Sequence, residues 1–246
     1  MAKTKQRLDL LLVERGLMES RTKAQALIMA GEVLVNGQVE TKASATFLLD
    51  VELSIKEGQR FVSRGGEKLE GAFKYFNLNV NEIICADIGA STGGFTDCLI
   101  QHGARRVCAV DVGKGQLHWK LRNDPKVVII DECNARNLDP KLFPEKPSFA
   151  TVDVSFISLT KILPALVRVM NTSFEMLTLI KPQFEVGKGL VPDGGVLKDV
   201  VVRDESVKRV VEGIQEAGFV SSGVIPSPIT GADGNVEFLA HFVKKE

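Results

Sequence analysis

The sequence predicts an α/β fold with a mainly parallel sheet, preceded by a small and separate α+β module. Past residue 67, short apolar segments alternate with helical patterns, which is typical of a parallel sheet covered by helices. Residues 86–113 read strand, glycine-rich loop, helix and a second strand that ends in an acidic residue, as in the nucleotide-binding half of a doubly wound sheet. We therefore divide the chain into a module at 1–58, a linker at 59–66 and a main domain at 67–246.

The composition is that of an ordinary globular protein. The 246 residues are 44% hydrophobic and 25% charged, and their net charge of zero gives no argument for nucleic acid. No apolar run approaches the roughly 18 residues that span a bilayer, and the first residues lack the apolar core of a signal peptide. The cysteines have no C-x-x-C spacing, so we expect reduced thiols and a cytoplasmic protein. They are Cys85, Cys98, Cys108 and Cys133.

The front module shows two helical patterns, each closed by a glycine, followed by segments of period-two alternation. Ser20 is a suitable N-cap for the second helix, and Asn36-Gly37 marks a tight turn between strands. The expected elements are helices that end near Gly16 and Gly31 and strands that include 33–35 and 51–55.

The main domain alternates strands with helices. Its last two strands are joined by a short link rich in proline and glycine, so we expect them to pair antiparallel. The long loop at 182–198 is interrupted by glycines and follows a strand that ends at the expected site, which favours a mobile lid. The expected strands are 83–87, 106–111, 127–131, 148–154, 174–180, 219–225 and 235–243. A helix is expected from about 94 to 101, and the clearest helices are 158–170 and 203–217.

The glycine-rich loop departs from a dinucleotide fingerprint, which reads G-x-G-x-x-G. Its spacing gives Gly89, Ser91 and Gly94, so the glycine that would touch a pyrophosphate is missing. Asp87 adds a carboxylate at the loop entrance, where a pyrophosphate would be repelled. S-adenosylmethionine has no phosphate and carries a net positive charge, and Asp111 is placed to accept hydrogen bonds from its ribose. The alternative is a structural turn that binds no ligand.

Four ionisable residues are placed where an open parallel sheet binds its ligands, beyond the carboxyl ends of its strands. Asp153 lies at the end of the apolar segment 150–152, and Lys181 follows directly on the segment 177–180. Glu237 falls inside the last strand, where a buried carboxylate needs a partner. Lys68 lies in the first turn of a helix, where a cation is unfavourable with the helix dipole. Taken singly each is weak, since a lysine at a strand end is more often solvated than catalytic.

The front module resembles the small RNA-binding module called alpha-L, which occurs in a small-subunit ribosomal protein, in pseudouridine synthases and in tyrosyl-tRNA synthetase. The resemblance rests on Arg7-Leu8-Asp9, on the segment from Ser20 to Ala24 and on GEVLVNG at 31–37. It implies that Arg7, Arg21 and Lys23 face RNA. The alternative is a solvated basic face on a small scaffold.

The four ionisable residues together match the tetrad Lys68-Asp153-Lys181-Glu237 of FtsJ-like ribose 2′-O-methyltransferases. With the front module, the whole chain resembles the TlyA family of ribosomal RNA cytidine 2′-O-methyltransferases, many of which carry the label hemolysin. The supporting motifs are SRGGEKL (63–69), DIGASTGGFTD (87–97), AVDVGKGQL (109–117), DVSFISL (153–159), IKPQFE (180–185) and GNVEF (234–238).

This resemblance implies a class I methyltransferase with a seven-stranded Rossmann-like sheet and S-adenosyl-L-methionine as cofactor. Its partners would be ribosomal RNA and ribosomal subunits, with no membrane and no metal. The target nucleotide and the oligomeric state stay open. The residues expected to hold the cofactor are Asp87, Gly89, Ser91, Gly93, Gly94, Phe95, Asp111, Asn134 and Asp153.

The chemistry expected of the tetrad is removal of a proton from a weakly acidic ribose hydroxyl during an in-line attack. Lys181, desolvated and close to a second cation, would act as the base or would stabilise the alkoxide, and the sequence leaves both open. Asp153 would orient Lys181, and Glu237 would hold Lys68 or the ribose.

Other functions find less support in the sequence. Methylation of an exocyclic amine usually needs D/N-P-P-Y/F where this chain reads Asp153-Val154-Ser155-Phe156, and carbon-five methylation needs a cysteine that here never follows proline. A membrane-active toxin would need an insertion segment. A non-catalytic ribosome-binding factor would be favoured by a loss of tetrad residues, all of which are present.

Overall fold

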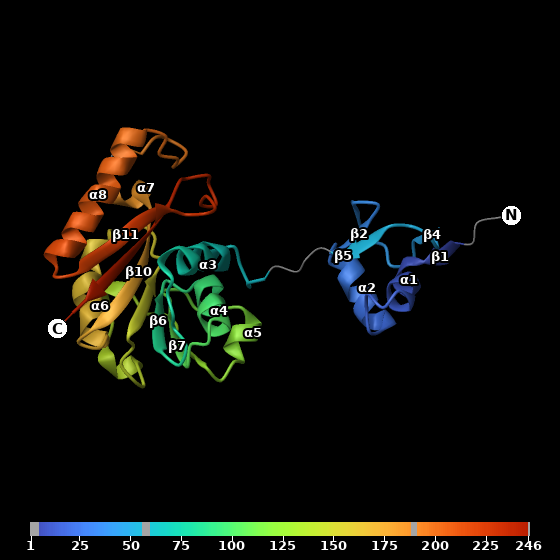
Figure 1. Cartoon of the computed structure of the whole chain (residues 1–246), viewed down its shortest axis with the longest axis horizontal. Helices are drawn as coiled ribbons and strands as arrows, with labels where there is room; N and C mark the ends of the chain where they lie inside the picture. The colour runs from blue at the N-terminus through green and yellow to red at the C-terminus, as the bar shows by residue number, and fades with distance from the viewer. Residues whose placement is uncertain (1–4, 56–59, 188–190, 246) are drawn as a thin grey trace. The chain divides into compact units, whose positions relative to one another are not determined.

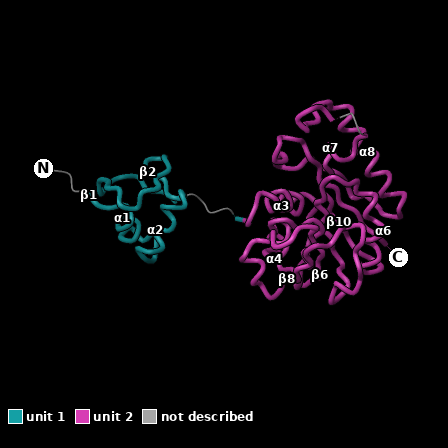
Figure 2. Tube along the Cα trace, turned by 180° about the vertical axis from the view of Figure 1, so that it is seen from behind, with its two compact units in different colours: residues 1–60 teal, residues 61–246 magenta. Residues whose placement is uncertain are grey.

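The computed structural model describes residues 5–55, 60–187 and 191–245, which divide into two compact units, 1–60 and 61–246 (Figure 2). Each unit is described by itself. Residues 56–59, which cover the end of the expected module and the first residue of the expected linker, and residues 188–190, within the expected lid, lie outside the described residues.

Unit 1 packs two helices against short antiparallel strands. Leu8, Leu12, Ala24 and Ile28 are fully buried and form its core with the apolar side of β2. The helices are α1 (Leu8–Glu14) and α2 (Arg21–Met29), and the strands are β1 (Lys5–Arg7), β2 (Val33–Val35), β3 (Gln38–Glu40), β4 (Thr46–Leu48) and β5 (Leu53–Ile55). They form a sheet of order β3-β2-β5 and a separate β1-β4 pair.

The turns of unit 1 follow the local chemistry that the sequence indicates. The Ser20 side chain caps α2 by accepting a hydrogen bond from the Lys23 backbone N–H at 3.3 Å. Asn36 and Gly37 both have positive φ, 50° and 77°, as a two-residue turn between β2 and β3 requires.

Unit 2 is built on one seven-stranded sheet of order β11-β12-β10-β9-β6-β7-β8. The strands from β8 to β10 in this order pair in parallel, and β12 pairs antiparallel with both β10 and β11. The expected α/β class and antiparallel end are therefore confirmed. The strands are β6 (Ile84–Ile88), β7 (Arg106–Val110), β8 (Val127–Ile130), β9 (Phe149–Val152), β10 (Phe174–Ile180), β11 (Val220–Pro226) and β12 (Phe238–Lys244).

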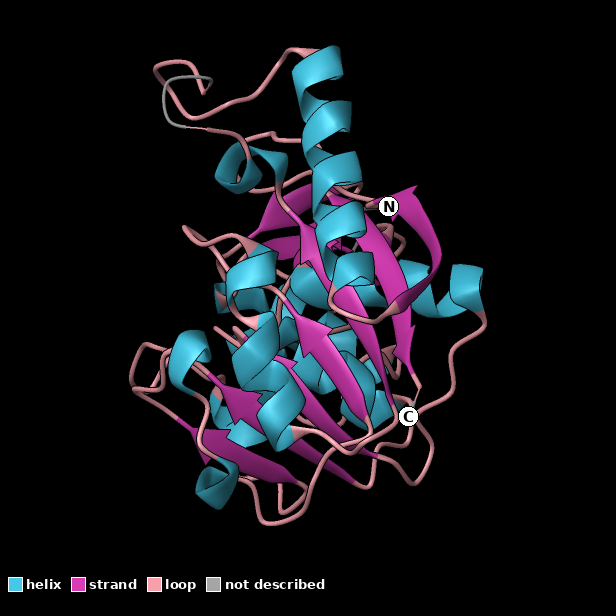
Figure 3. Ribbon diagram, turned by 90° about the vertical axis from the view of Figure 1, so that its left-hand side faces the viewer, coloured by secondary structure: helices cyan, strands magenta, loops and turns pink. Residues whose placement is uncertain are grey.

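Helices cover both faces of this sheet (Figures 1 and 3). On one face, α3 (Gly65–Phe76) and α4 (Gly94–Gln101) pack on Cys85, Val107 and Leu177. On the other, α6 (Leu163–Val169) and α8 (Val200–Glu216) pack on Ala86, Cys108 and Met176. Successive residues of each strand thus enter opposite cores, as the pleat dictates. The remaining helical segments are α5 (Trp119–Arg122), α7 (Pro182–Glu185), η1 (Ala135–Asn137), η2 (Pro140–Leu142) and η3 (Leu159–Lys161).

Most expected elements agree with the structure to within a few residues, but two differ in a way that has a local cause. The helix expected at 158–170 is divided into η3 and α6, because Pro164 has no backbone N–H to donate and is best placed in the first turn of a new helix. The strand expected at 235–243 begins only at Phe238. The side chain of Asn235 instead bonds backbone groups of the loop before α8, namely Leu197 N–H and Gly195 C=O.

All four cysteines are free thiols, and Cys85, Cys98 and Cys108 are buried. Within the described ranges, none of the helices combines the length and apolar character needed to span a bilayer.

Candidate active site

The glycine-rich loop lies between β6 and α4 at the carboxyl edge of the sheet. Gly89 has φ of 87°, and a Cβ there would lie 2.1 Å from the carbonyl oxygen of Asp153. A side chain is therefore excluded twice, by backbone conformation and by the close approach of the segment after β9. Gly93 has φ of 95°, and a Cβ there would meet Leu121 at 2.3 Å. The glycine spacing thus reflects packing as well as space for a ligand.

Asp111 ties the loop to the end of β7. Its Oδ2 accepts a hydrogen bond from Ser91 N–H at 2.8 Å, and its Oδ1 accepts one from Gly113 N–H at 2.7 Å. A carboxylate has about four lone-pair sites, so Asp111 keeps acceptor capacity for a ligand. Its position at a strand end beside the loop is the one that the sequence predicts.

A cavity of about 490 Å³ opens beside Asp111, within the size range of small-molecule sites. We call it the donor cavity. Its wall includes loop, strand-end and tetrad residues. Among the residues expected to hold a cofactor, those that line it are Gly89, Ser91, Asp111, Asn134 and Asp153.

A second cavity of about 190 Å³, here the acceptor cavity, shares part of this wall. Gly89, Ser91 and Asp153 line both cavities. Lys181 lines the donor cavity, whereas Lys68 lines the acceptor cavity. Gly94 and Phe95, expected at the cofactor, also line the acceptor cavity. Two ligands that occupied these cavities would therefore meet at Asp153.

Asp87 lies elsewhere than expected. It is fully buried beneath the loop, where it accepts hydrogen bonds from Thr96 Oγ1 at 2.6 Å and Thr151 Oγ1 at 2.9 Å. Burial raises the pKa of Asp87 to about 6, and the two hydroxyl groups oppose this rise. Neither cavity is lined by Asp87 or Gly93. Asp87 therefore does not lie at the loop entrance, where it was expected to repel a pyrophosphate.

The tetrad is arranged as two ion pairs. Lys181 Nζ lies 2.5 Å from Asp153 Oδ1, and Lys68 Nζ lies 2.5 Å from Glu237 Oε2. The register explains why residues so far apart in sequence meet. Ile180 of β10 is opposite Phe238 of β12, so the next residues, Lys181 and Glu237, leave this antiparallel pair at the same edge of the sheet.

The two pairs differ in their surroundings. The side chains of Lys68 and Glu237 are 11% and 4% exposed, whereas those of Lys181 and Asp153 are 13% and 23% exposed. Lys181 Nζ also donates a hydrogen bond to Ser155 Oγ at 3.0 Å. Asp153 Oδ1 is buried and, within the described residues, receives no hydrogen bond of good geometry. Its contact with Lys181 is therefore an attraction of charges, and Ser155 supplies the directional contact.

Sequence reasoning assigned no role to Phe156, which the structure places at the wall of the donor cavity. Its side chain is 87% exposed, its φ is 63°, and its ring lies 4.7 Å from that of Phe184. A left-handed backbone is unusual for an aromatic residue and occurs preferentially at functional sites. The signal in the sequence was an aromatic residue three positions after a strand-end aspartate.

One cluster of potential metal ligands lies away from both cavities. The ligand atoms of Glu70, Cys98 and His102 lie within 4.8 Å of one another between α3 and α4. Glu70 also contacts His102 Nε2 at 2.7 Å and Lys74 Nζ at 3.2 Å, so cationic or protic partners already engage it. The expected absence of a metal stays a prediction.

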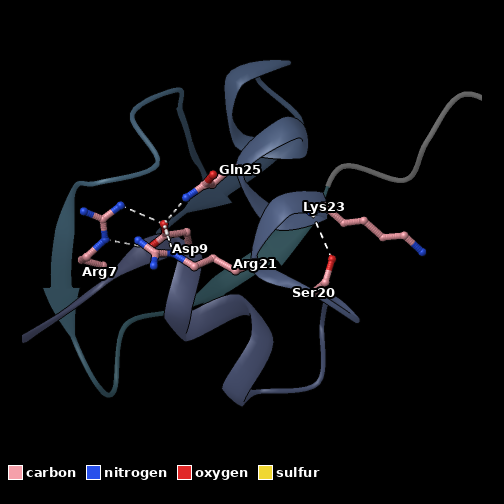
Figure 4. A network of polar contacts seen from close by, with 6 residues as sticks. All are labelled: Arg7, Asp9, Ser20, Arg21, Lys23 and Gln25. Carbon is pink, nitrogen blue, oxygen red and sulfur yellow. Dashed lines mark hydrogen bonds and ion pairs between the residues drawn. The ribbon is translucent and has the colours of Figure 1, made fainter.

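In unit 1, the structure brings Arg7 and Arg21 together but not Lys23 (Figure 4). Both arginines donate hydrogen bonds to the buried carboxylate of Asp9, whereas Lys23 forms an ion pair with Glu19 one turn away. The sequence did not assign Asp9 a role, although it stands in the Arg-Leu-Asp segment that supports the resemblance.

Comparison with known proteins agrees with this geometry. Residues 61–244 match the FtsJ-like methyltransferase family and residues 6–50 match the S4 domain. The chain is 46% identical to the protein named hemolysin A of Brachyspira hyodysenteriae, over 96% of this chain and 99% of that one. It is 45% identical to the 16S/23S rRNA (cytidine-2'-O)-methyltransferase TlyA of Mycobacterium tuberculosis, over 94% and 87%.

A solved structure from Streptococcus thermophilus that carries a hemolysin name is 43% identical, with a TM-score of 0.75 over 100% of this chain and 90% of that one. These matches span both units. The chain therefore belongs to the TlyA family, in which an S4 domain precedes an FtsJ-like methyltransferase domain.

Proposed function

We propose that this methyltransferase uses S-adenosylmethionine to methylate the 2′-hydroxyl of a ribose, in cytidine of ribosomal RNA. The observation that carries the proposal is the meeting of two cavities at Asp153, with one lysine ion pair on the side of each. Methyl transfer needs a donor and an acceptor aligned across a short gap. The choice of cytidine follows the name of the TlyA relative from Mycobacterium tuberculosis.

The donor cavity suits S-adenosylmethionine in size and in chemistry. Asp111 has acceptor capacity left for ribose hydroxyl groups, and Asn134 offers an amide on the same wall. Asp153 would balance the positive charge of the ligand. When bound, S-adenosylmethionine would supply a methyl group on a sulfonium, which is already a good leaving group.

The remaining task for the protein is to deal with the acceptor proton. Lys181 lines the donor cavity and is held by Ser155 and by Asp153, which lines both cavities. In its neutral form Lys181 would take the proton from the 2′-hydroxyl, and in its charged form it would stabilise the developing alkoxide. Lys68 lines the acceptor cavity and is fixed by Glu237, which suits it to orient the ribose.

Carbon-five methylation is disfavoured because it needs a cysteine thiolate. Burial raises the pKa of the Cys108 thiol to about 11 and that of Cys85 further still. Cys133 lines the donor cavity, and its pKa is also raised by partial burial. None of these thiols is prepared as a nucleophile, which supports a hydroxyl acceptor.

The S4 domain supports a substrate made of RNA. We propose that unit 1 anchors the ribosomal subunit, with Arg7 and Arg21 on its phosphates and Lys23 adding charge, while unit 2 carries out the transfer. Binding of this kind weakens as salt rises, because it releases counterions from the phosphate backbone.

The test is transfer of tritiated methyl from S-adenosylmethionine to purified, unmodified small and large ribosomal subunits. Digestion to nucleosides should place the label in 2′-O-methylcytidine, and the Lys181→Ala protein should give none. Label in a base would overturn the ribose assignment. Absence of label with intact subunit binding would favour a non-catalytic factor, and lysis of lipid vesicles without methyl transfer would favour a membrane-active protein.

A further inference from the structure

Asp9 is a buried anion in the face of unit 1 that we assign to RNA. Its side chain is completely inaccessible, yet four hydrogen bonds converge on its carboxylate (Figure 4). Arg7 donates through Nε and Nη2 at 2.9 and 2.8 Å, Arg21 through Nε at 2.9 Å, and Gln25 through Nε2 at 2.7 Å. The carboxylate thus joins the end of β1, α1 and the first residue of α2.

The contacts of this carboxylate favour its ionised form. The Arg7 guanidinium, with help from Gln25 and Arg21, holds the pKa of Asp9 well below its usual range although burial opposes this. Asp9 therefore compensates two cations that share one anchor, and the three charged groups carry a net charge of plus one. Without it, two guanidinium groups this close would repel each other.

The guanidinium groups remain open to a partner on their outer sides. The side chains of Arg7 and Arg21 are 38% and 52% exposed. Each guanidinium has five N–H donors, of which Arg7 uses two on Asp9 and Arg21 one. Three donors of Arg7 and four of Arg21 are thus not used by Asp9. Planar guanidinium groups with several outward donors suit bidentate binding of phosphate.

We propose that Asp9 is a positioning residue that holds Arg7 and Arg21 as one rigid fork for the phosphodiester backbone of RNA. The inference rests on the proposed role of unit 1 as the RNA anchor. Holding the two arginines in place has an entropic advantage, since a side chain already fixed in its binding geometry loses less conformational freedom when RNA binds. Lys23 differs, because its pair with Glu19 joins side chains that are 60% and 80% exposed. It contributes charge but no fixed direction.

A positioning role for Asp9 and charge alone predict opposite effects of Asp9→Asn on the affinity for RNA. Asp9→Asn removes a negative charge from a surface that binds a polyanion, so simple electrostatics predicts tighter binding. A positioning role predicts weaker binding, because the arginines lose their common anchor. Glu52→Gln is the matched control, since it removes one exposed negative charge from the same unit without touching the fork.

The measurement is the affinity of the full-length protein for purified small and large ribosomal subunits, determined by filter binding over a range of salt. We expect Asp9→Asn to weaken binding by about tenfold, as for the loss of charge-assisted contacts. Glu52→Gln should bind as the wild type does or more tightly. If Asp9→Asn binds as tightly as Glu52→Gln, the positioning role is wrong.

Two further variants keep the test decisive if Asp9→Asn fails to fold, which thermal unfolding would reveal. Arg7→Lys and Arg21→Lys keep the net charge but lose the planar fork, so each should weaken binding while retaining the dependence on salt. Wild-type affinity in both would also overturn the inference. The double variant Arg7→Ala/Arg21→Ala separates the two proposals. If that variant binds subunits as the wild type does, this face of unit 1 is not the RNA anchor. If binding is lost only in the double variant, the face does anchor RNA, but Asp9 does not act as a positioning residue.

Discussion

Lys68 and Glu237 are 169 positions apart in the chain and form a buried ion pair with 2.5 Å between Nζ and Oε2. Lys68 belongs to α3, and Glu237 directly precedes β12. The pair therefore links α3 to the start of β12, the strand that pairs antiparallel in the sheet. It lies beside the acceptor cavity, which Lys68 lines. We expect both the stability of unit 2 and methyl transfer to depend on this ion pair, and single and double variants can separate the two effects.

Removal of one partner should destabilise unit 2. Lys68→Met leaves the Glu237 carboxylate buried without its cation, which costs about 3 kcal/mol in comparable cases. The double variant Lys68→Met/Glu237→Leu should recover much of this loss, since no isolated charge remains, but should not transfer methyl groups. Urea unfolding and methyl transfer to subunits measure the two effects. A double variant with wild-type activity would remove this pair from the proposed mechanism.

A second prediction concerns pH and Asp87. Its pKa is raised from 3.8 to about 6 by burial, so the folded protein binds this proton more tightly than the unfolded chain does. The resulting stabilisation is fully present below about pH 4 and is lost as pH rises through about 6, a change of about 3 kcal/mol for a shift of this size. The free energy of unfolding of Asp87→Asn should lack this dependence on pH, and near neutral pH the variant should be more stable than the wild type. Urea unfolding of both proteins between about pH 4 and pH 6 gives the difference in their free energies of unfolding. A difference that does not change with pH would contradict the prediction.

The sequence predicts the sheet well, and the sheet explains why the residues of the expected tetrad come together. Strand patterns locate Asp153 and Lys181 at strand ends, and parallel strands must bring their carboxyl ends to one edge. The antiparallel entry of β12 adds Glu237 to the same edge. The strands β1 and β4 were missed, because neither Lys5–Arg7 nor Thr46–Leu48 alternates apolar with polar residues over its length.

What the sequence could not predict depends on tertiary contacts. Two threonines far apart in sequence place Asp87 beneath the loop rather than at its mouth. Arg7 and Arg21 were expected to face RNA, and only the packing of α1 on α2 shows that they also share the Asp9 carboxylate. The left-handed backbone of Phe156 and the exposure of its ring also depend on the folded surroundings, and the sequence predicts neither.

A third prediction tests the donor cavity through Asp111. Asp111→Ala removes the acceptor for a ribose and the two backbone contacts that hold the loop. Binding of S-adenosylhomocysteine, measured by calorimetry, should weaken by about 1–3 kcal/mol, as for hydrogen bonds to a charged group. The affinity of Asp111→Asn for S-adenosylhomocysteine should lie between those of the wild type and of Asp111→Ala, because an amide oxygen can replace only one carboxylate oxygen. Tight binding of nicotinamide dinucleotide to the wild type would instead reject the proposed cofactor.

A fourth prediction concerns Phe156. An exposed ring beside the proposed reaction site can stack with an unpaired base, and such stacking contributes about 1–3 kcal/mol. Phe156→Ala should therefore lower methyl transfer to subunits by more than any loss of affinity for S-adenosylhomocysteine accounts for. Phe156→Trp, which keeps an aromatic face, should retain most of the activity. Equal losses in both variants would point to the strained backbone rather than to stacking.

The last prediction separates the two roles open to Lys181. Arginine keeps the positive charge but cannot lose a proton at any accessible pH. If Lys181 removes the hydroxyl proton, Lys181→Arg should be nearly as inactive as Lys181→Ala, with cofactor affinity intact in both, and the wild-type single-turnover rate should rise with pH to a plateau. Ser155→Ala removes a hydrogen bond that favours the charged lysine, so it should move this rise to lower pH. Ser155→Thr keeps the hydroxyl group and should restore the wild-type profile. If Lys181→Arg retains substantial methyl transfer with no dependence on pH, the lysine only stabilises the alkoxide, because a fixed cation then performs the same task.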